Sequence, residues 1–168
     1  GRGLILATGA RSRPLGLARE EALTGHGVSY CAACDGGLYL GKNVAVVGGG
    51  NTALLDCLLL AQGCGRVYLI HRRSSFRGEK ALLEQVQALH NVEIRTDASV
   101  TELLGPERLS GIRLQSGETL AVDALFIAVG RQPRTEPFAR LVELDPGGYI
   151  RAGEDCRTTA QGIFCAGD

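Results

Sequence analysis

The chain has 168 residues, which corresponds to one or one-and-a-half globular domains. Hydrophobic residues make up 45% and charged residues 21%, so wholesale disorder is excluded. Lys plus Arg and Asp plus Glu both number 18, and this formal net charge of +0 argues against a nucleic-acid binder. Because neither a leader nor a membrane span is visible, we expect a cytoplasmic protein with no membrane partner. Since the first residue is Gly1, we also expect it to be part of a longer protein.

The first two thirds of the chain alternate strand-sized apolar runs with helical segments. Residues 4–7 predict a short strand ended by a turn, and residues 11–43, which are rich in glycine, predict an irregular segment. The elements expected next are a strand at 44–47, a helix at 51–62, a strand at 66–70, an amphipathic helix at 76–90 and a strand at 92–94. This βαβαβ order predicts a parallel, doubly wound, Rossmann-like sheet in three layers.

The pattern changes after the third of these strands. Residues 98–104, 109–114 and 119–122 predict three short strands joined by tight turns, which is typical of an antiparallel β-meander. Residues 124–129 predict one more apolar strand, and residues 131–168 contain no long helix. The predicted fold class is therefore α/β, with a parallel sheet and an added antiparallel meander.

A glycine-rich segment joins the predicted strand at 44–47 to the helix at 51–62. Gly48, Gly50 and Ala53 form a G-x-G-x-x-A pattern in the strand-turn-helix context that dinucleotide binding requires. The first glycine permits the tight turn, and the second lets the backbone approach a pyrophosphate. The free N–H groups at the start of the helix, near Asn51 and Thr52, then face the phosphates. A glycine triplet can also be a simple turn, but this context favours dinucleotide binding.

The end of the second parallel strand indicates which dinucleotide is bound. NAD sites usually have an acidic residue there, about 20 residues after the glycines, to hold the ribose 2′-hydroxyl. This chain instead has His71, Arg72 and Arg73, followed by Arg77, with no acid among them. Arginine side chains suit a phosphate ester. We therefore predict NADPH rather than NADH, and the alternative is a solvated basic loop.

Of the six cysteines, only Cys31 and Cys34 have a recognisable spacing. A zinc ribbon would need a second such pair, and the sequence does not supply one. Two thiols at this spacing can close a disulfide across one helical turn, and Asp35 beside them offers a carboxylate for proton transfer. The pair predicts a redox-active dithiol. The remaining cysteines are expected to be buried core residues, because free Cys is among the most buried residue types; they are Cys57, Cys64, Cys156 and Cys165.

The motifs occur together in the order found in one enzyme family. Ala-Thr-Gly at 7–9, Cys-x-x-Cys-Asp-Gly at 31–36, the segment 46–53, His-Arg-Arg-x-x-Phe-Arg at 71–77 and the terminal Ala-Gly-Asp follow one another. In this the chain resembles low-molecular-weight thioredoxin reductases from Ile5 to the end. The resemblance implies NADPH-dependent, FAD-linked reduction of a thioredoxin disulfide, and a homodimeric full-length enzyme. It also implies an NADPH and dithiol domain at 14–130, inserted in a truncated FAD domain at 1–13 and 131–168.

The resemblance also implies roles for individual residues. Cys31 would attack the partner disulfide, and Cys34 would face the flavin. Asp35 would be the acid that protonates Cys34. No metal site is implied. The residues expected to bind the two cofactors are Ala7, Thr8, Gly9, Gly48, Gly50, Asn51, Thr52, Ala53, His71, Arg72, Arg73, Arg77, Gly130, Arg131 and Asp168.

The chain also departs from the family pattern. The family's first G-x-G-x-x-G, which binds the FAD diphosphate, is absent, and so is the segment after the terminal aspartate. We therefore expect the fragment alone to be inactive. Two alternatives stay open: a catalytically silent NADPH-binding module, and the equivalent module of an alkyl hydroperoxide reductase flavoprotein subunit.

Overall fold

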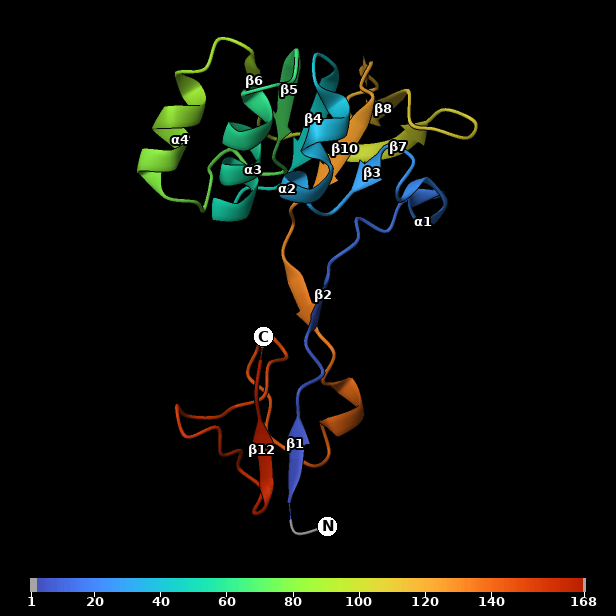
Figure 1. Cartoon of the computed structure of the whole chain (residues 1–168). Helices are drawn as coiled ribbons and strands as arrows, with labels where there is room; N and C mark the ends of the chain where they lie inside the picture. Colours follow the sequence, from blue (N-terminus) through green and yellow to red (C-terminus); the bar gives the residue numbers. More distant parts are fainter. Residues whose placement is uncertain (1–2, 168) are drawn as a thin grey trace. The chain divides into compact units, whose positions relative to one another are not determined.

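The computed structural model describes residues 3–167, which form two compact units. The larger unit contains residues 13–130, and the smaller one combines residues 3–12 with 131–167. Figure 1 shows the elements of each unit in sequence colours.

The larger unit is built on a five-stranded sheet in which every strand pair is parallel. The strands follow the order β3-β10-β4-β5-β6 across the sheet. Their bounds are Val28–Ser29 for β3, Ala124–Ile127 for β10, Asn43–Val47 for β4, Arg66–Ile70 for β5 and Val92–Arg95 for β6. The three central strands consist mostly of Val, Ile, Leu, Ala and Phe because both faces of a parallel sheet are covered.

Alternate residues of the central strands enter two different cores. Val44 and Val46 pack with residues of α3 (Asn51–Ala61) and α4 (Lys80–Gln87). Ala45 and Val47 pack with the meander strands β7 (Val100–Leu104), β8 (Gly111–Leu114) and β9 (Thr119–Leu120) on the opposite face. Helices on one face and an antiparallel meander on the other give three layers (Figure 1), as the sequence predicted.

The structure corrects two predictions about secondary structure in this unit. The helix expected at 76–90 is limited to Lys80–Gln87, because the backbone N–H groups of Arg77 and Gly78 donate to Gly49 O at 2.8 and 3.1 Å instead of entering a helix. The segment 11–43 is not simply irregular. It contains part of β2 (Ala10–Ser12), then α1 (Glu20–Leu23), β3, α2 (Ala32–Asp35) and the 3-10 turn η1 (Gly36–Tyr39).

The smaller unit is held together by two strand pairs and a few turns. β1 (Leu4–Leu6) pairs in parallel with β12 (Ile163–Cys165), and β2 pairs antiparallel with β11 (Arg131–Pro133). A 3-10 turn, η2 (Glu136–Phe138), follows β11. Among residues 3–167 no helix is long and apolar enough to cross a bilayer.

Candidate functional site

The glycine loop between β4 and α3 is shaped by close backbone contacts. A Cβ atom at Gly48 would lie 2.4 Å from Ala128 O and 2.7 Å from the Cβ of Ala53, so only glycine fits there. A Cβ atom at Gly50 would meet nothing within 4 Å. Ala53 is fully buried, whereas Thr52 is exposed in the first turn of α3. This arrangement leaves the backbone at Gly50 open to a ligand in front of the helix N-terminus.

The ring of His71 packs against the glycine loop at Gly49. Its ring is 5% exposed, and a Cβ atom at Gly49 would lie 2.1 Å from His71 Cε1. The ring stacks on Phe76 with centroids 4.9 Å apart, and Nε2 lies 3.0 Å from Ser75 O. Gly49 must therefore be glycine because the His71 ring occupies the space of a side chain, and His71 also lines the cavity next to this loop.

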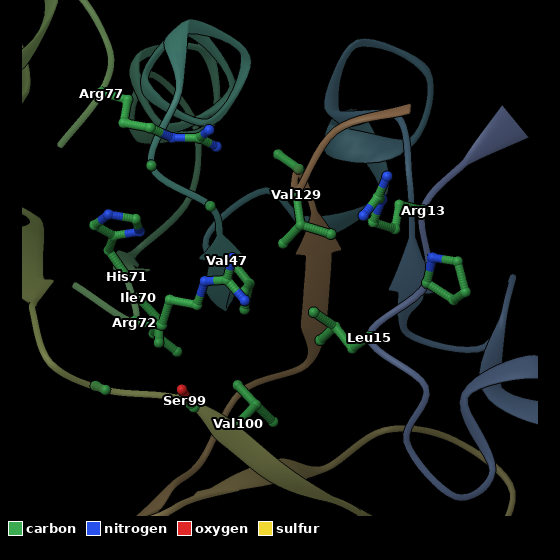
Figure 2. Close-up of a pocket in the computed structure, with 15 residues that line it drawn as sticks. Arg13, Leu15, Val47, Ile70, His71, Arg72, Arg77, Ser99, Val100 and Val129 are labelled. Atoms are coloured by element: carbon green, nitrogen blue, oxygen red, sulfur yellow. The ribbon is translucent and has the colours of Figure 1, made fainter. Parts of the chain in front are cut away.

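A cavity of about 310 Å³ opens beside the glycine loop (Figure 2). Gly48 and Gly49 line it together with Arg72 and Arg77, and Arg13 adds a third guanidinium group. The volume lies at the lower end of the range for small-molecule pockets. Since no acidic side chain is among the lining residues, the cavity suits an anionic ligand. Sequence reasoning did not identify Arg13; Arg73 is exposed and does not line this cavity.

A buried carboxylate fixes the loop that carries Arg13. Glu20 is 4% exposed and accepts hydrogen bonds from the backbone N–H groups of Leu15, Gly16 and Leu17 at 2.9, 2.8 and 3.0 Å. Tyr30 Oη donates to the same carboxylate at 2.6 Å, and burial, reinforced by Glu20, raises the pKa of Tyr30. Sequence reasoning missed Glu20 because its partners are backbone groups of an irregular segment.

Asn51 connects the two helices of the larger unit. Its Nδ2 donates to Glu79 Oε1 at 2.9 Å, and Glu79 N donates to Asn51 Oδ1 at 2.7 Å. Glu79 precedes the first residue of α4, so this pair sets the position of α4 relative to the start of α3.

Cys31 and Cys34 form a disulfide at the N-terminus of α2, with Cα atoms 5.3 Å apart. Cys31 is the N-cap residue, and its Sγ accepts a hydrogen bond from Cys34 N at 3.1 Å. Cys34 is exposed, whereas Cys31 is half-buried. The predicted dithiol pair is therefore close enough to be oxidised and reduced as a unit.

Ser29 links this disulfide to Asp35. Ser29 is 5% exposed at the end of β3, and its Oγ donates to Asp35 Oδ2 at 2.6 Å. The same oxygen accepts from Cys31 N at 3.1 Å. Ser29 therefore fixes the Asp35 carboxylate relative to the disulfide. Sequence reasoning missed this residue, and the available signal was a hydroxyl at the end of a strand two residues before the first cysteine.

The other four cysteines fall into two classes. Cys57 and Cys64 are buried as predicted, and burial raises the pKa of both thiols, to about 12 for Cys57. The prediction was wrong for Cys156, which is exposed, and for Cys165, which is half-buried. Both lie in the smaller unit, where few side chains are buried.

The smaller unit contains the other predicted cofactor residues. Thr8, Gly9, Ala166 and Gly167 help to line a cavity of about 70 Å³, and Ala7 is exposed beside it. Asp168 lies outside the described residues. Two further predicted residues lie where the units divide: Gly130 ends the larger unit, and Arg131 begins β11.

Comparison with known proteins identifies the family. Residues 2–168 match the model of the pyridine nucleotide-disulphide oxidoreductases. The chain belongs to this family. It is 40% identical over 171 residues to a thioredoxin reductase of Streptomyces coelicolor, covering 98% of this chain and 53% of that protein. It is also 44% identical over 177 residues to a glucosaminate ammonia-lyase of Pseudomonas fluorescens, covering 98% of this chain and 55% of that protein.

A solved structure agrees with this assignment. Lactococcus lactis thioredoxin reductase in its FR conformation matches 99% of this chain and 57% of that one, with a TM-score of 0.87 at 31% identity. The predicted resemblance to thioredoxin reductases and the predicted fold class are confirmed. The chain spans about half the length of the curated relatives it matches.

Proposed function

We propose that this oxidoreductase chain is the NADPH-binding and dithiol module of an enzyme that reduces the disulfide of a thioredoxin-like protein. The observation that carries the proposal is the Cys31–Cys34 disulfide, beside Asp35, in the same compact unit as the glycine-loop cavity. The module would comprise residues 14–130, and residues 1–13 and 131–168 would belong to the FAD-binding domain.

The glycine-loop cavity fits the diphosphate of a nicotinamide cofactor. The backbone at Gly50 is open, and three guanidinium groups, from Arg13, Arg72 and Arg77, face a cavity with no lining carboxylate. When bound, NADPH supplies a hydride. Arg72 and Arg77 would hold its 2′-phosphate, because a guanidinium donates paired hydrogen bonds to phosphate oxygens. Asn51, Thr52 and His71 would act mainly by shaping this loop and the helix end.

The described residues do not form a complete flavin site. The cavity at Thr8, Gly9, Ala166 and Gly167 has a volume of about 70 Å³, well below the usual range of about 300–1,000 Å³ for ligand pockets. We propose that these residues, with Asp168, contribute one edge of an FAD site that needs further polypeptide. No step of the reaction is therefore derived through the flavin.

The dithiol itself would reduce the partner by thiol–disulfide exchange. In the reduced module, the Cys31 thiolate attacks one sulfur of the partner disulfide, which forms a mixed disulfide and releases the other partner sulfur as a thiolate. The Cys34 thiolate then attacks Cys31 Sγ, which frees the second partner sulfur and re-forms the Cys31–Cys34 disulfide. Asp35, which accepts a hydrogen bond from Ser29 Oγ, would carry the proton that accompanies these steps. The full-length enzyme would be a cytoplasmic homodimer.

Trapping the mixed disulfide tests this proposal. A reduced Cys34→Ser chain mixed with oxidised thioredoxin should retain thioredoxin covalently through Cys31, because the resolving thiol is missing. Non-reducing electrophoresis followed by mass spectrometry of the linked peptides measures this. Cys64→Ser, which removes a buried thiol, is the control and should not trap the partner. Trapping only by Cys31→Ser would reverse the two roles. The experiment must distinguish these outcomes because Cys34 is more exposed than Cys31.

The alternative of a silent NADPH-binding module is tested separately. A colourless chain that binds NADPH but neither traps nor reduces any protein disulfide would support that alternative. The module of an alkyl hydroperoxide reductase would be indicated if the Cys34→Ser chain trapped a thioredoxin-like domain of a peroxidase system in preference to thioredoxin itself.

A further inference from the structure

Cys156 and Cys165 lie opposite each other in the smaller unit. Arg157 and Phe164 form an antiparallel bridge, and the neighbouring bonds run from Cys165 N to Cys156 O at 2.9 Å and from Thr158 N to Ile163 O at 3.2 Å. The first of these bonds joins Cys165 directly to Cys156, so the two residues are opposed across the bridge; Cys156 N donates to Gly153 O at 3.0 Å and not back to Cys165. Both carry free thiols.

The bond from Cys165 N to Cys156 O brings the backbones of the two cysteines together. The Cα atoms of an antiparallel pair that exchanges two such bonds are about 5.5 Å apart, and the single bond here holds the two Cα atoms at a similar separation. Disulfides span Cα distances of about 4.4–6.8 Å. Cys156 Sγ has only a weak contact, to Glu154 O at 3.9 Å, so rotation about its Cα–Cβ bond breaks no strong hydrogen bond.

The surroundings of Cys156 differ from those of the buried cysteines. Cys156 is exposed and has a φ of 61°, a left-handed conformation that residues other than glycine seldom adopt. Cys165 is half-buried at the end of β12. Cys57 and Cys64 are closed off by burial, and the pKa of each is raised. An oxidant in solution therefore reaches Cys156 first.

We propose that Cys156 and Cys165 are a second oxidisable dithiol, with a hydroperoxide as the oxidant. The Cys156 thiolate attacks the O–O bond, which breaks to give a sulfenic acid on Cys156 and, after protonation, water or an alcohol. The Cys165 thiol then attacks the Cys156 sulfur and displaces a water molecule. Two thiols lose two electrons in all and form one disulfide, and the hydroperoxide is reduced by the same two electrons.

This pair is separate from the Cys31–Cys34 disulfide, and the inference does not rest on the proposed reductase function. A disulfide here would join β12 to the segment before Arg157. β12 leads directly into Ala166 and Gly167, which line the small cavity of this unit. Oxidation would therefore fix the shape of one wall of that cavity.

Peptide mapping after peroxide treatment tests the inference. The chain, with Cys31–Cys34 oxidised, is treated with hydrogen peroxide, its remaining thiols are alkylated in denaturant, and it is digested with trypsin without reductant. Trypsin cuts after Arg151 and Arg157, so a Cys156–Cys165 disulfide joins peptide 152–157 to peptide 158–168. We expect this linked pair in the monomer, and Cys57 and Cys64 alkylated in full.

Three variants make the outcome decisive. Cys165→Ser should stop at the sulfenic acid, which dimedone captures on Cys156, and Cys156→Ser should lose the linked peptides. A chain with Cys31→Ser and Cys34→Ser together should still form them, which separates this result from any failure of the reductase proposal. The inference is overturned if the wild-type chain keeps both thiols, links them only between two chains, or oxidises Cys156 to sulfinic acid without the cross-link.

Discussion

The two compact units differ most in how much apolar surface they bury. The larger unit has a core on both faces of its sheet, with Phe126, Leu54 and Ile112 among many fully buried side chains. In the part of the smaller unit that the structure describes, the buried apolar residues are Leu6, Pro133 and Val142. Because burial of apolar surface is the main favourable contribution to folding, the larger unit has its own source of stability, whereas the described residues of the smaller unit supply little.

The surroundings of the two pairs of cysteines differ in the same way, in how much core lies next to them. Cys31 and Cys34 lie beside a buried strand end, where Ser29 holds Asp35 in place. Cys156 and Cys165 lie on a short ladder with almost no core beneath it. The repeated thiol–disulfide exchange proposed for Cys31 and Cys34 is suited to the rigid frame. Modification that changes the local structure is suited to the weakly packed one.

The largest expected effect tests the difference in core directly. The ring of Phe126 is 1% exposed and packs edge-on against Tyr39, with the two ring centroids 5.9 Å apart. Phe126→Ala removes this ring and should destabilise the larger unit by about 3–5 kcal/mol. Leu6→Ala in the smaller unit should cost about 2 kcal/mol or less, because its neighbours can close the gap. Native-state hydrogen exchange reports on each unit separately. Equal loss of protection in both units for either variant would show that the chain unfolds as one.

Regular elements of the larger unit were predictable from the sequence because their pattern is local. The run Val44–Val47, the glycines after it and the apolar helix that follows each carry their own signal, and the structure has them where expected. The Cys31 and Cys34 pair was predictable for the same reason, since one helical turn brings residues three apart close together.

Features that depend on distant contacts were not predictable. The start of α4 moved to Lys80 because residues 77 and 78 bond to Gly49, far away in the sequence. The parts played by Glu20 and Ser29 depend on backbone groups brought together only by the fold. The exposure of Cys156 likewise follows from the thin core of the smaller unit, which composition does not reveal.

The next largest effect is expected on NADPH affinity, from substitutions in the nucleotide cavity. Arg72→Ala combined with Arg77→Ala should lower NADPH affinity by roughly ten- to a thousandfold, because charged hydrogen bonds contribute about 1.5–3 kcal/mol each and screening reduces that value. NADH lacks the 2′-phosphate, so its affinity should change little. Calorimetry at low and high salt measures both cofactors. Arg66→Ala removes an exposed guanidinium of the same unit that does not line the cavity and is the control. Equal wild-type affinity for both cofactors would contradict an NADPH site.

A smaller effect is expected at the loop that carries Arg13. Glu20→Gln keeps the shape of the side chain but replaces one accepting oxygen with an amide donor. Because each oxygen accepts two hydrogen bonds, two of the four partners lose their acceptor. We expect a loss of about 1.5–3 kcal/mol in stability, together with weaker NADPH binding. Thermal unfolding and calorimetry measure these two effects. Glu21→Gln changes an exposed neighbour and should alter neither the stability nor the NADPH affinity. Equal losses of stability and affinity in the two variants would argue against this role of Glu20.

The smallest expected effect concerns Asp56, a half-buried carboxyl on α3. Burial raises its pKa from 3.8 to about 6, so the folded chain holds this proton more tightly than the unfolded chain does. The stability of the larger unit should therefore fall as the pH rises from about 4 to about 6, and stay lower above that range. Partial exposure limits the loss to about 1 kcal/mol.

Asp56→Asn cannot ionise and should remove this pH dependence. The variant should match the wild-type chain near about pH 4 and exceed its stability by about 1 kcal/mol near about pH 8. Urea unfolding of both chains across this range is the measurement. Glu107→Gln, which alters an exposed carboxyl of the same unit, is the control and should leave the slope unchanged. If Asp56→Asn kept the wild-type slope, another group in the core would be responsible, and the burial of Asp56 would not be what limits the stability of the larger unit at neutral pH.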